Sequence, residues 1–131
     1  PTNGGRVLLV LQEKGLIKLK PEAGLKATPL DVTDNPKKIK FVEVDAAQLP
    51  RTLDDLDAAA INTNFALPAG LTPGKDSIAQ ENAKGPYVNV IVVQEQNKDK
   101  PWVAKLIKAY QSEENRKFIQ TEFKGSVVAG F

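Results

Sequence analysis

The chain has 131 residues, the length of one domain, and its 18 Lys+Arg against 16 Asp+Glu leave a net charge of +2. The two signs are interleaved along the sequence, which is not typical of a nucleic-acid-binding protein. Because Cys and His are absent, disulfides, Cys or His metal sites and serine-triad or Cys–His catalysis are excluded, and we expect neither a metal nor a cofactor. The most apolar runs, 7–11 and 88–93, are far shorter than the ~20 residues of a transmembrane helix.

The first segment predicts a helix with a turn signal at each end. Thr2 or Asn3 can cap it, residues 4–6 (Gly-Gly-Arg) would form its first turn, and Gly15 stands where a C-terminal glycine is preferred. Residues 16–20 then alternate apolar and Lys side chains, so they predict a short strand or an extended arm.

Three later segments have the composition of strands. Residues 38–44 alternate, residues 57–62 have the small side chains of a buried strand, and residues 87–94 form the strongest strand pattern in the chain. The unbroken apolar character of 87–94 predicts a central strand that is buried on both faces.

Helical patterns lie between and after these strands. A short helix is predicted over 64–69, a longer one begins at Pro101, and Ser112 can cap a last helix that runs to about residue 123. The alternation of helices and strands predicts an α/β fold.

Arg6 is the first candidate binding residue. It follows two glycines, which let a ligand approach the backbone, and it lies near the positive end of the predicted helix. Its two-pronged donor matches a carboxylate or a phosphate. The local sequence alone is also that of a simple helix start with a solvated arginine, which is the commoner arrangement.

Three asparagines are further candidates. Asn89 interrupts an apolar strand, where its amide needs a partner that either a ligand or a neighbouring loop can supply. Asn62 and Asn64 lie where a predicted strand leads into a helix, which is a common place for ligands in α/β sheets. Asparagine is also a routine helix cap, and capping is the expected role of one of the two.

Five blocks of sequence, in order along the whole chain, carry a family resemblance. They are PTNGGR at 1–6, AAQLPRTLDDLDAAAINTNFAL at 46–67, PYVNVIVV at 86–93, KLIKAYQSEENRKFI at 105–119 and FKGSVV at 123–128. Together they resemble the NlpA/MetQ family of methionine-binding lipoproteins, which serve an ABC importer. The chain is similar to the C-terminal half of these proteins.

The resemblance implies a two-lobed periplasmic-binding-protein fold of type II. Residues 1–88 would form its second α/β lobe. Residues 89–131 would form a crossover strand and a helix pair that returns to the first lobe.

The resemblance also assigns roles to the candidate residues. Arg6 would pair with the carboxylate of the bound amino acid, and Asn64 and Asn89 would hold its polar backbone. Three more residues would support these without touching the ligand themselves: Asn3, Asn62 and Tyr87.

The implied function is that of a substrate-binding component, without catalytic activity, which binds D- or L-methionine in a cleft between lobes and delivers it to the permease. Its partners would be the permease and ATPase subunits, and its own N-terminal half or a second copy, but no nucleic acid. The implied location is the bacterial cell envelope, in the periplasm or on the outer face of the membrane, with a lipid anchor. The start of this chain carries neither a signal peptide nor an anchor pattern.

Other functions remain alternatives at this point. The same scaffold could bind another apolar amino acid or a methionyl dipeptide. A small α/β enzyme that uses Lys and carboxylates would require a lysine beside a carboxylate with shifted pKa values in a cleft. An interaction module with a sticky apolar surface is the third alternative.

Overall fold

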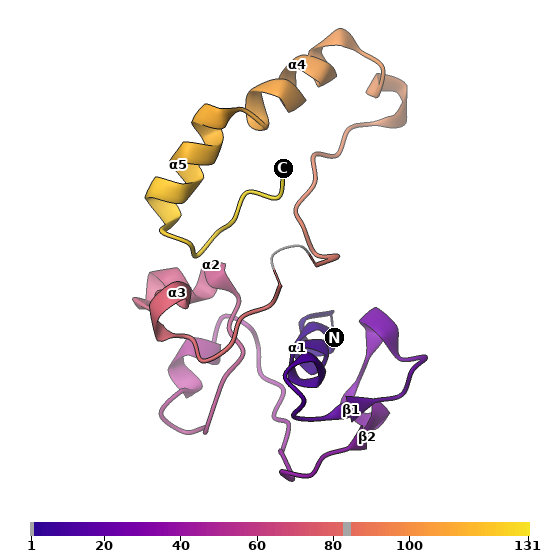
Figure 1. Cartoon of the computed structure of the whole chain (residues 1–131), viewed down its shortest axis with the longest axis vertical. Coiled ribbons are helices and arrows are strands. Elements are labelled where there is room, and N and C mark those ends of the chain that lie inside the picture. Colours follow the sequence, from indigo (N-terminus) through magenta and orange to yellow (C-terminus); the bar gives the residue numbers. More distant parts are fainter. Residues whose placement is uncertain (1, 83–84) are drawn as a thin grey trace. The chain divides into compact units, whose positions relative to one another are not determined.

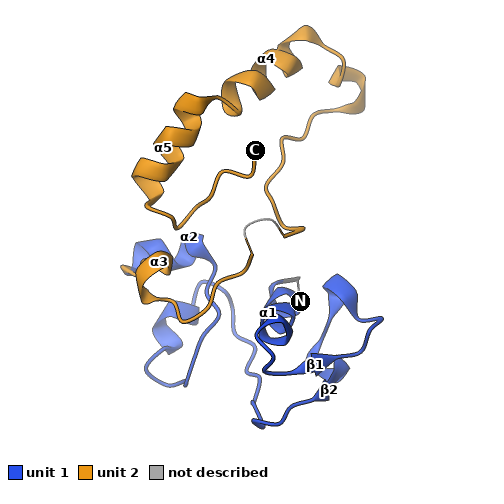
Figure 2. Ribbon diagram, in the orientation of Figure 1, with its two compact units in different colours: residues 1–69 blue, residues 70–131 orange. Residues whose placement is uncertain are grey.

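A computed structural model describes residues 2–82 and 85–131, and the chain divides into two compact units, residues 1–69 and residues 70–131 (Figures 1 and 2). The first unit contains the helices α1 (Thr2–Glu13) and α2 (Thr63–Ala66) and the strands β1 (Lys18–Leu19) and β2 (Val32–Asp34). The second unit contains the helices α3 (Pro73–Asp76), α4 (Pro101–Tyr110) and α5 (Glu113–Phe123).

Helix α1 ends as the sequence predicts. Gly15 has a φ of +69°, the left-handed conformation that glycine adopts without strain. Its N–H donates to the carbonyl of Gln12 over 2.9 Å, and the N–H of Leu16 donates to the carbonyl of Leu11 over 2.9 Å. This pair of hydrogen bonds is the Schellman motif, which terminates the helix and turns the chain toward β1.

The core of the first unit lies between α1 and a small sheet. Strand β1 pairs antiparallel with β2, so residues 16–20 do contain a short strand. The most deeply buried side chains of this core are Leu8 and Ile17, each 2% exposed, together with Leu19 and Ala27. The side-chain carbonyl of Gln12 accepts a hydrogen bond of 2.8 Å from the N–H of Leu19, which ties α1 to β1.

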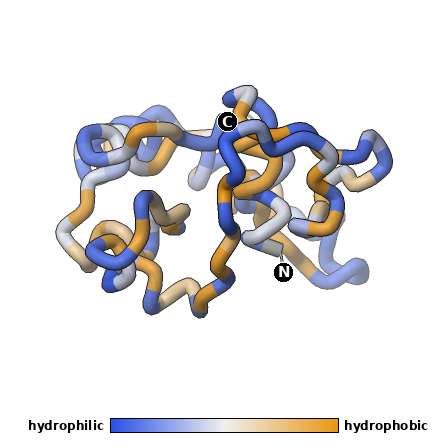
Figure 3. The backbone as a smooth tube through the Cα atoms, turned by 90° about the horizontal axis from the view of Figure 1, so that it is seen from below, coloured by the Kyte–Doolittle hydropathy of each residue, from blue (hydrophilic) through white to orange (hydrophobic). Residues whose placement is uncertain are grey.

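The three longer strands predicted from the sequence are not strands in this chain. Residues 38–44, 57–62 and 87–94 form no sheet within the described part of the molecule. A strand exists only when a neighbour satisfies its backbone groups, and β-propensity expresses packing on such a neighbour. The prediction that 87–94 is buried on both faces is also wrong here, since Val90 is 72% and Val92 82% exposed. Apolar residues recur along both units (Figure 3).

Helices α4 and α5 of the second unit begin at their predicted signals. Pro101 occupies the first position of α4, and Ser112 caps α5 by accepting a hydrogen bond of 3.2 Å from the N–H of Asn115. Helix α5 ends where Lys124 and then Gly125 adopt positive φ values. In the described residues, 2–82 and 85–131, no helix is long and apolar enough to span a membrane.

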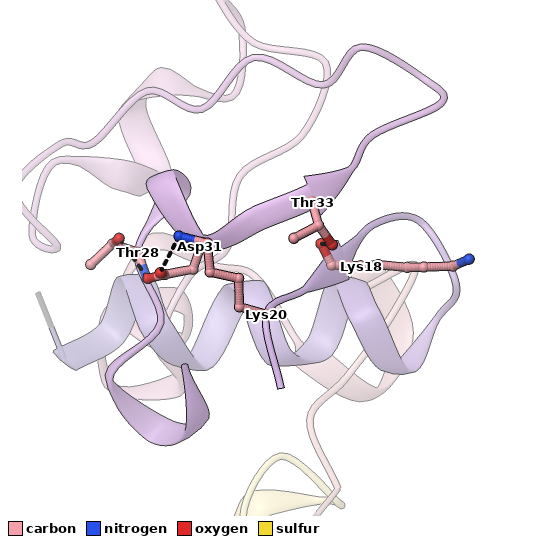
Figure 4. Close-up of polar contacts among 5 residues, drawn as sticks. All are labelled: Lys18, Lys20, Thr28, Asp31 and Thr33. Carbon is pink, nitrogen blue, oxygen red and sulfur yellow. Dashed lines mark hydrogen bonds and ion pairs between the residues drawn. The ribbon is translucent and has the colours of Figure 1, made fainter. Parts of the chain in front are cut away.

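A polar clamp holds the turn that precedes β2 (Figure 4). One carboxylate oxygen of Asp31 accepts hydrogen bonds from the N–H of Thr28 over 2.9 Å and from its hydroxyl over 2.8 Å. The other oxygen lies 3.6 Å from the ammonium nitrogen of Lys20. The hydrogen bonds from Thr28, aided by the charge of Lys20, lower the pKa of Asp31 below its ordinary value of 3.8.

Because a lowered carboxyl pKa stabilises the folded state only while the group is ionised, the clamp has a defined pH dependence. We expect the wild-type chain to be more stable than the Asp31→Asn variant above about pH 4, and this advantage to be lost as the pH falls through the lowered pKa of Asp31. Urea unfolding of the two proteins between pH 7 and pH 2 measures the difference. An advantage that does not change over this range would contradict the prediction.

Candidate functional site

Arg6 lies in the N-terminal part of α1 and is half-buried. The helix begins at Thr2, so Thr2 and Asn3 are both helical residues, and the prediction that one of them is the cap is wrong. The residue before Thr2 lies outside the described residues. The first N–H groups of a helix have no partner within it and form the positive end of its dipole. This end of α1 therefore favours an anion, and Arg6, the fifth residue of the helix, lies just after the first turn rather than within it as predicted.

The double glycine before Arg6 is in close contact with the rest of the first unit. Gly5 is buried, and a Cβ atom there would lie 2.9 Å from the carbonyl oxygen of Leu25 and 3.1 Å from that of Ala27. A Cβ atom on Gly4 would lie 3.1 Å from a carboxylate oxygen of Glu43, which is a flexible side chain. The atoms that approach Gly5 most closely thus belong to the backbone, which cannot easily move to make room for a side chain.

The start of α2 lies beside the start of α1. The side-chain amide of Asn62 donates a hydrogen bond of 3.5 Å to the side-chain oxygen of Asn3. Asn62 is the N-cap residue of α2, but its side chain makes no capping hydrogen bond, so it is a cap by position only. Asn64 lies in the first turn of α2 and is exposed to solvent. Arg6, Asn3, Asn62 and Asn64 all belong to the first unit.

The two remaining predicted site residues belong to the second unit. Asn89 is exposed in the unpaired segment 88–94, and Tyr87 is half-buried in the turn that precedes it. The expected strand setting of Asn89 is therefore not present in this chain.

Two hollows of the second unit contain none of the predicted site residues. One, of about 170 Å³, is lined by α5 and the residues that follow it, and one, of about 470 Å³, lies where α4 meets α5. Among the described residues no group of three or more acidic side chains is placed to hold a metal ion.

Two features of the first unit are not among the predictions from the sequence. The approach of Leu25 and Ala27 to Gly5 brings together backbone atoms that are distant in sequence, and no local pattern indicates it. The Asp31 clamp did have a signal, because Thr28-x-x-Asp31 is the spacing of a capping box.

A curated relative covers the whole chain. The D-methionine-binding lipoprotein MetQ of Escherichia coli strain K12 is 52% identical over 133 residues, and the match covers 100% of this chain and 49% of that protein. The chain spans about half the length of the curated relatives it matches.

Solved structures give the same result for the fold. A nutrient-binding protein from Burkholderia cenocepacia bound to methionine is similar with a TM-score of 0.87 and 57% identity, over 100% of this chain and 56% of that chain. A periplasmic substrate-binding protein of an ABC transporter from Coxiella burnetii has a TM-score of 0.86 and 44% identity, over 98% of this chain and 55% of that one.

These similarities confirm the expected α/β class, with this chain as part of a two-lobed binding-protein fold. They also confirm the resemblance seen in the sequence. The model of the family described as NlpA lipoprotein matches residues 1–131, and the chain belongs to this family.

Proposed function

We propose that this chain is half of a methionine-binding protein that serves an ABC importer, and that it is the half that binds the carboxylate of methionine. The observation that carries the proposal is the similarity, at 57% identity over the whole chain, to a structure bound to methionine. The name of the Escherichia coli relative specifies D-methionine, so either stereoisomer is a candidate ligand. The relatives are binding proteins, and the proposal includes no catalytic step.

The chemistry of the candidate residues suits a zwitterionic amino acid. A carboxylate needs a cation and N–H donors, which Arg6 and the start of α1 supply. An ammonium group needs oxygen acceptors, which the amide side chains of Asn64 and Asn89 offer. Asn3, Asn62 and Tyr87 would orient these groups without contacting the ligand. The thioether of methionine would occupy an apolar pocket, to which the other half of the protein contributes most.

In this proposal residues 1–88 form one lobe of the full-length protein, and residues 89–131 form a crossover strand and a helix pair that packs on the other lobe. The segments that form no sheet here, 38–44 and 87–94 among them, would acquire strand neighbours in the two-lobed protein. Closure of the two lobes on methionine would create the form that the permease and ATPase subunits recognise.

The family description and the names of the relatives support a location in the bacterial cell envelope. We propose that the full-length protein is held by a lipid anchor in the periplasm or on the outer face of the membrane. The chain would associate with its own N-terminal half, or with a second copy when that half is absent.

Isothermal titration of the full-length protein with D- and L-methionine tests the proposal. We expect at least one isomer to bind more tightly than norleucine, leucine and a methionyl dipeptide, because the polar groups fix the amino-acid moiety and the pocket fits the thioether. Stronger binding of leucine or of the dipeptide would favour the alternative ligands on the same scaffold. Absence of binding for every amino acid tested would contradict the proposal.

A further inference from the structure

The backbone of residues 25–27 packs against the first residues of α1. Gly5 is buried against it, and a Cβ atom at this position would approach the carbonyl oxygens of Leu25 and Ala27 to 2.9 and 3.1 Å. Ala27 is itself only 3% exposed and belongs to the core around Leu8. The helix turn that precedes Arg6 therefore packs directly against the backbone of residues 25–27.

The Asp31 clamp holds this backbone segment from its other end. Both polar groups of Thr28, the residue after Ala27, donate to the Asp31 carboxylate (Figure 4). The N–H of Asp31 donates back to the carbonyl of Thr28 over 2.9 Å, and the N–H of Lys20 donates to the carbonyl of Asp31 over 2.9 Å. These hydrogen bonds join Thr28 to Asp31, and Asp31 in turn to Lys20 at the end of β1.

We propose that Asp31 and Gly5 are positioning residues for ligand binding: Asp31 fixes the 25–27 backbone, and Gly5 lets α1 seat on it so that Arg6 is aimed at the carboxylate of the ligand. This inference rests on the proposed function, since it takes Arg6 as the carboxylate ligand. Neither Asp31 nor Gly5 would touch methionine.

The reason for such support is geometric. A bidentate arginine–carboxylate pair requires alignment within about 0.5 Å, which a helix end provides only when it is itself held in place. Glycine at position 5 allows the closest approach, because any side chain would push α1 away from the carbonyl groups behind it. Displacement of a polar group by about 1 Å can cost up to 100-fold in function.

A second Lys–Asp pair, between residues of β1 and β2 themselves, provides the matched control. Asp34 lies 3.7 Å from the ammonium nitrogen of Lys18, as Asp31 lies 3.6 Å from that of Lys20. The Asp34–Lys18 pair is exposed and takes no part in the hydrogen bonds between Thr28 and Asp31, so its removal takes away a similar charge and leaves the clamp intact.

The experiment compares Gly5→Ala, Asp31→Ala and Asp34→Ala in the full-length protein, by titration with methionine at 25 °C. We expect methionine to bind about tenfold or more weakly to Gly5→Ala and Asp31→Ala. Asp34→Ala should stay within about twofold of the wild type, because an exposed ion pair contributes little. Asp31→Asn, which keeps an acceptor oxygen for Thr28, should lie between the wild type and Asp31→Ala.

Two further measurements separate positioning from general stability. Thermal unfolding verifies that each variant is folded at the temperature of titration. If Asp31→Ala is unfolded at this temperature, the affinities of Gly5→Ala and Asp31→Asn test the inference without it. In an Arg6→Ala background the Asp31→Ala change should weaken binding no further, because there is no guanidinium left to position. Equal weakening in both backgrounds, or affinities of Gly5→Ala and Asp31→Asn equal to that of the wild type, would overturn the inference. Failure of the wild type to bind methionine would instead overturn the proposed function.

Discussion

Replacement of Arg6 by alanine in the full-length protein is expected to weaken methionine binding by about 100-fold or more. Removal of one partner of a desolvated charge pair costs about 2–5 kcal/mol, because the carboxylate is left in the site without its cation. The helix dipole of α1 remains and retains part of the attraction, so binding should become weak without being abolished.

Two other arginine variants make this result specific. Arg6→Lys keeps the charge and loses the planar two-pronged donor, so it should recover only part of the affinity. Arg51→Ala removes an exposed arginine from the same unit and should leave the affinity for methionine unchanged. Isothermal titration compares the four proteins. An unchanged affinity of Arg6→Ala would remove this residue from the site.

The 131-residue chain by itself is expected to bind methionine with a dissociation constant above about 1 mM, or not at all. Ligand sites of this type bury at least 70% of the ligand surface, which requires walls on every side. The first unit offers polar groups for the amino-acid moiety, and we assign most of the pocket for the thioether to the other half of the protein. One side of a site supplies too little contact to offset the entropy lost on binding.

Titration of the isolated chain, with the full-length protein as positive control, measures this difference. Far-UV circular dichroism would verify that α1, α4 and α5 are formed in the sample. Submillimolar affinity of the folded chain would contradict the idea that the site is divided between two halves.

The parts of the fold that the sequence predicts correctly are those with local causes. Helix α5 begins where the hydroxyl of Ser112 can accept a hydrogen bond from Asn115, and α1 ends where glycine can adopt a positive φ. Both signals lie within a few residues of the atoms they act on. The strand predictions at 38–44 and 87–94 have no such local cause, since a strand depends on a neighbour that its own residues do not specify.

The same distinction applies to the candidate site. Residue type and position beside two glycines identify Arg6 as a candidate, but a solvated arginine is the commoner arrangement for such a local sequence. The family resemblance gives it the role of a carboxylate ligand, and that role stays a prediction, as do those of Asn64 and Asn89. The contact of Gly5 with the backbone of Leu25 and Ala27 could not be predicted, because only the folded chain brings these atoms together.

The exposed apolar run at 88–93 is expected to affect how the protein folds and aggregates in the cell. Val88, Val90 and Val92 are 49%, 72% and 82% exposed, and the backbone beside them has no sheet partner among the described residues. Such a β-branched segment, low in charge, is a site of aggregation until it is covered. Molecules in which it stays uncovered are expected to be bound by chaperones or degraded by proteases, so the amount of folded protein would depend on how fast the segment is covered after synthesis.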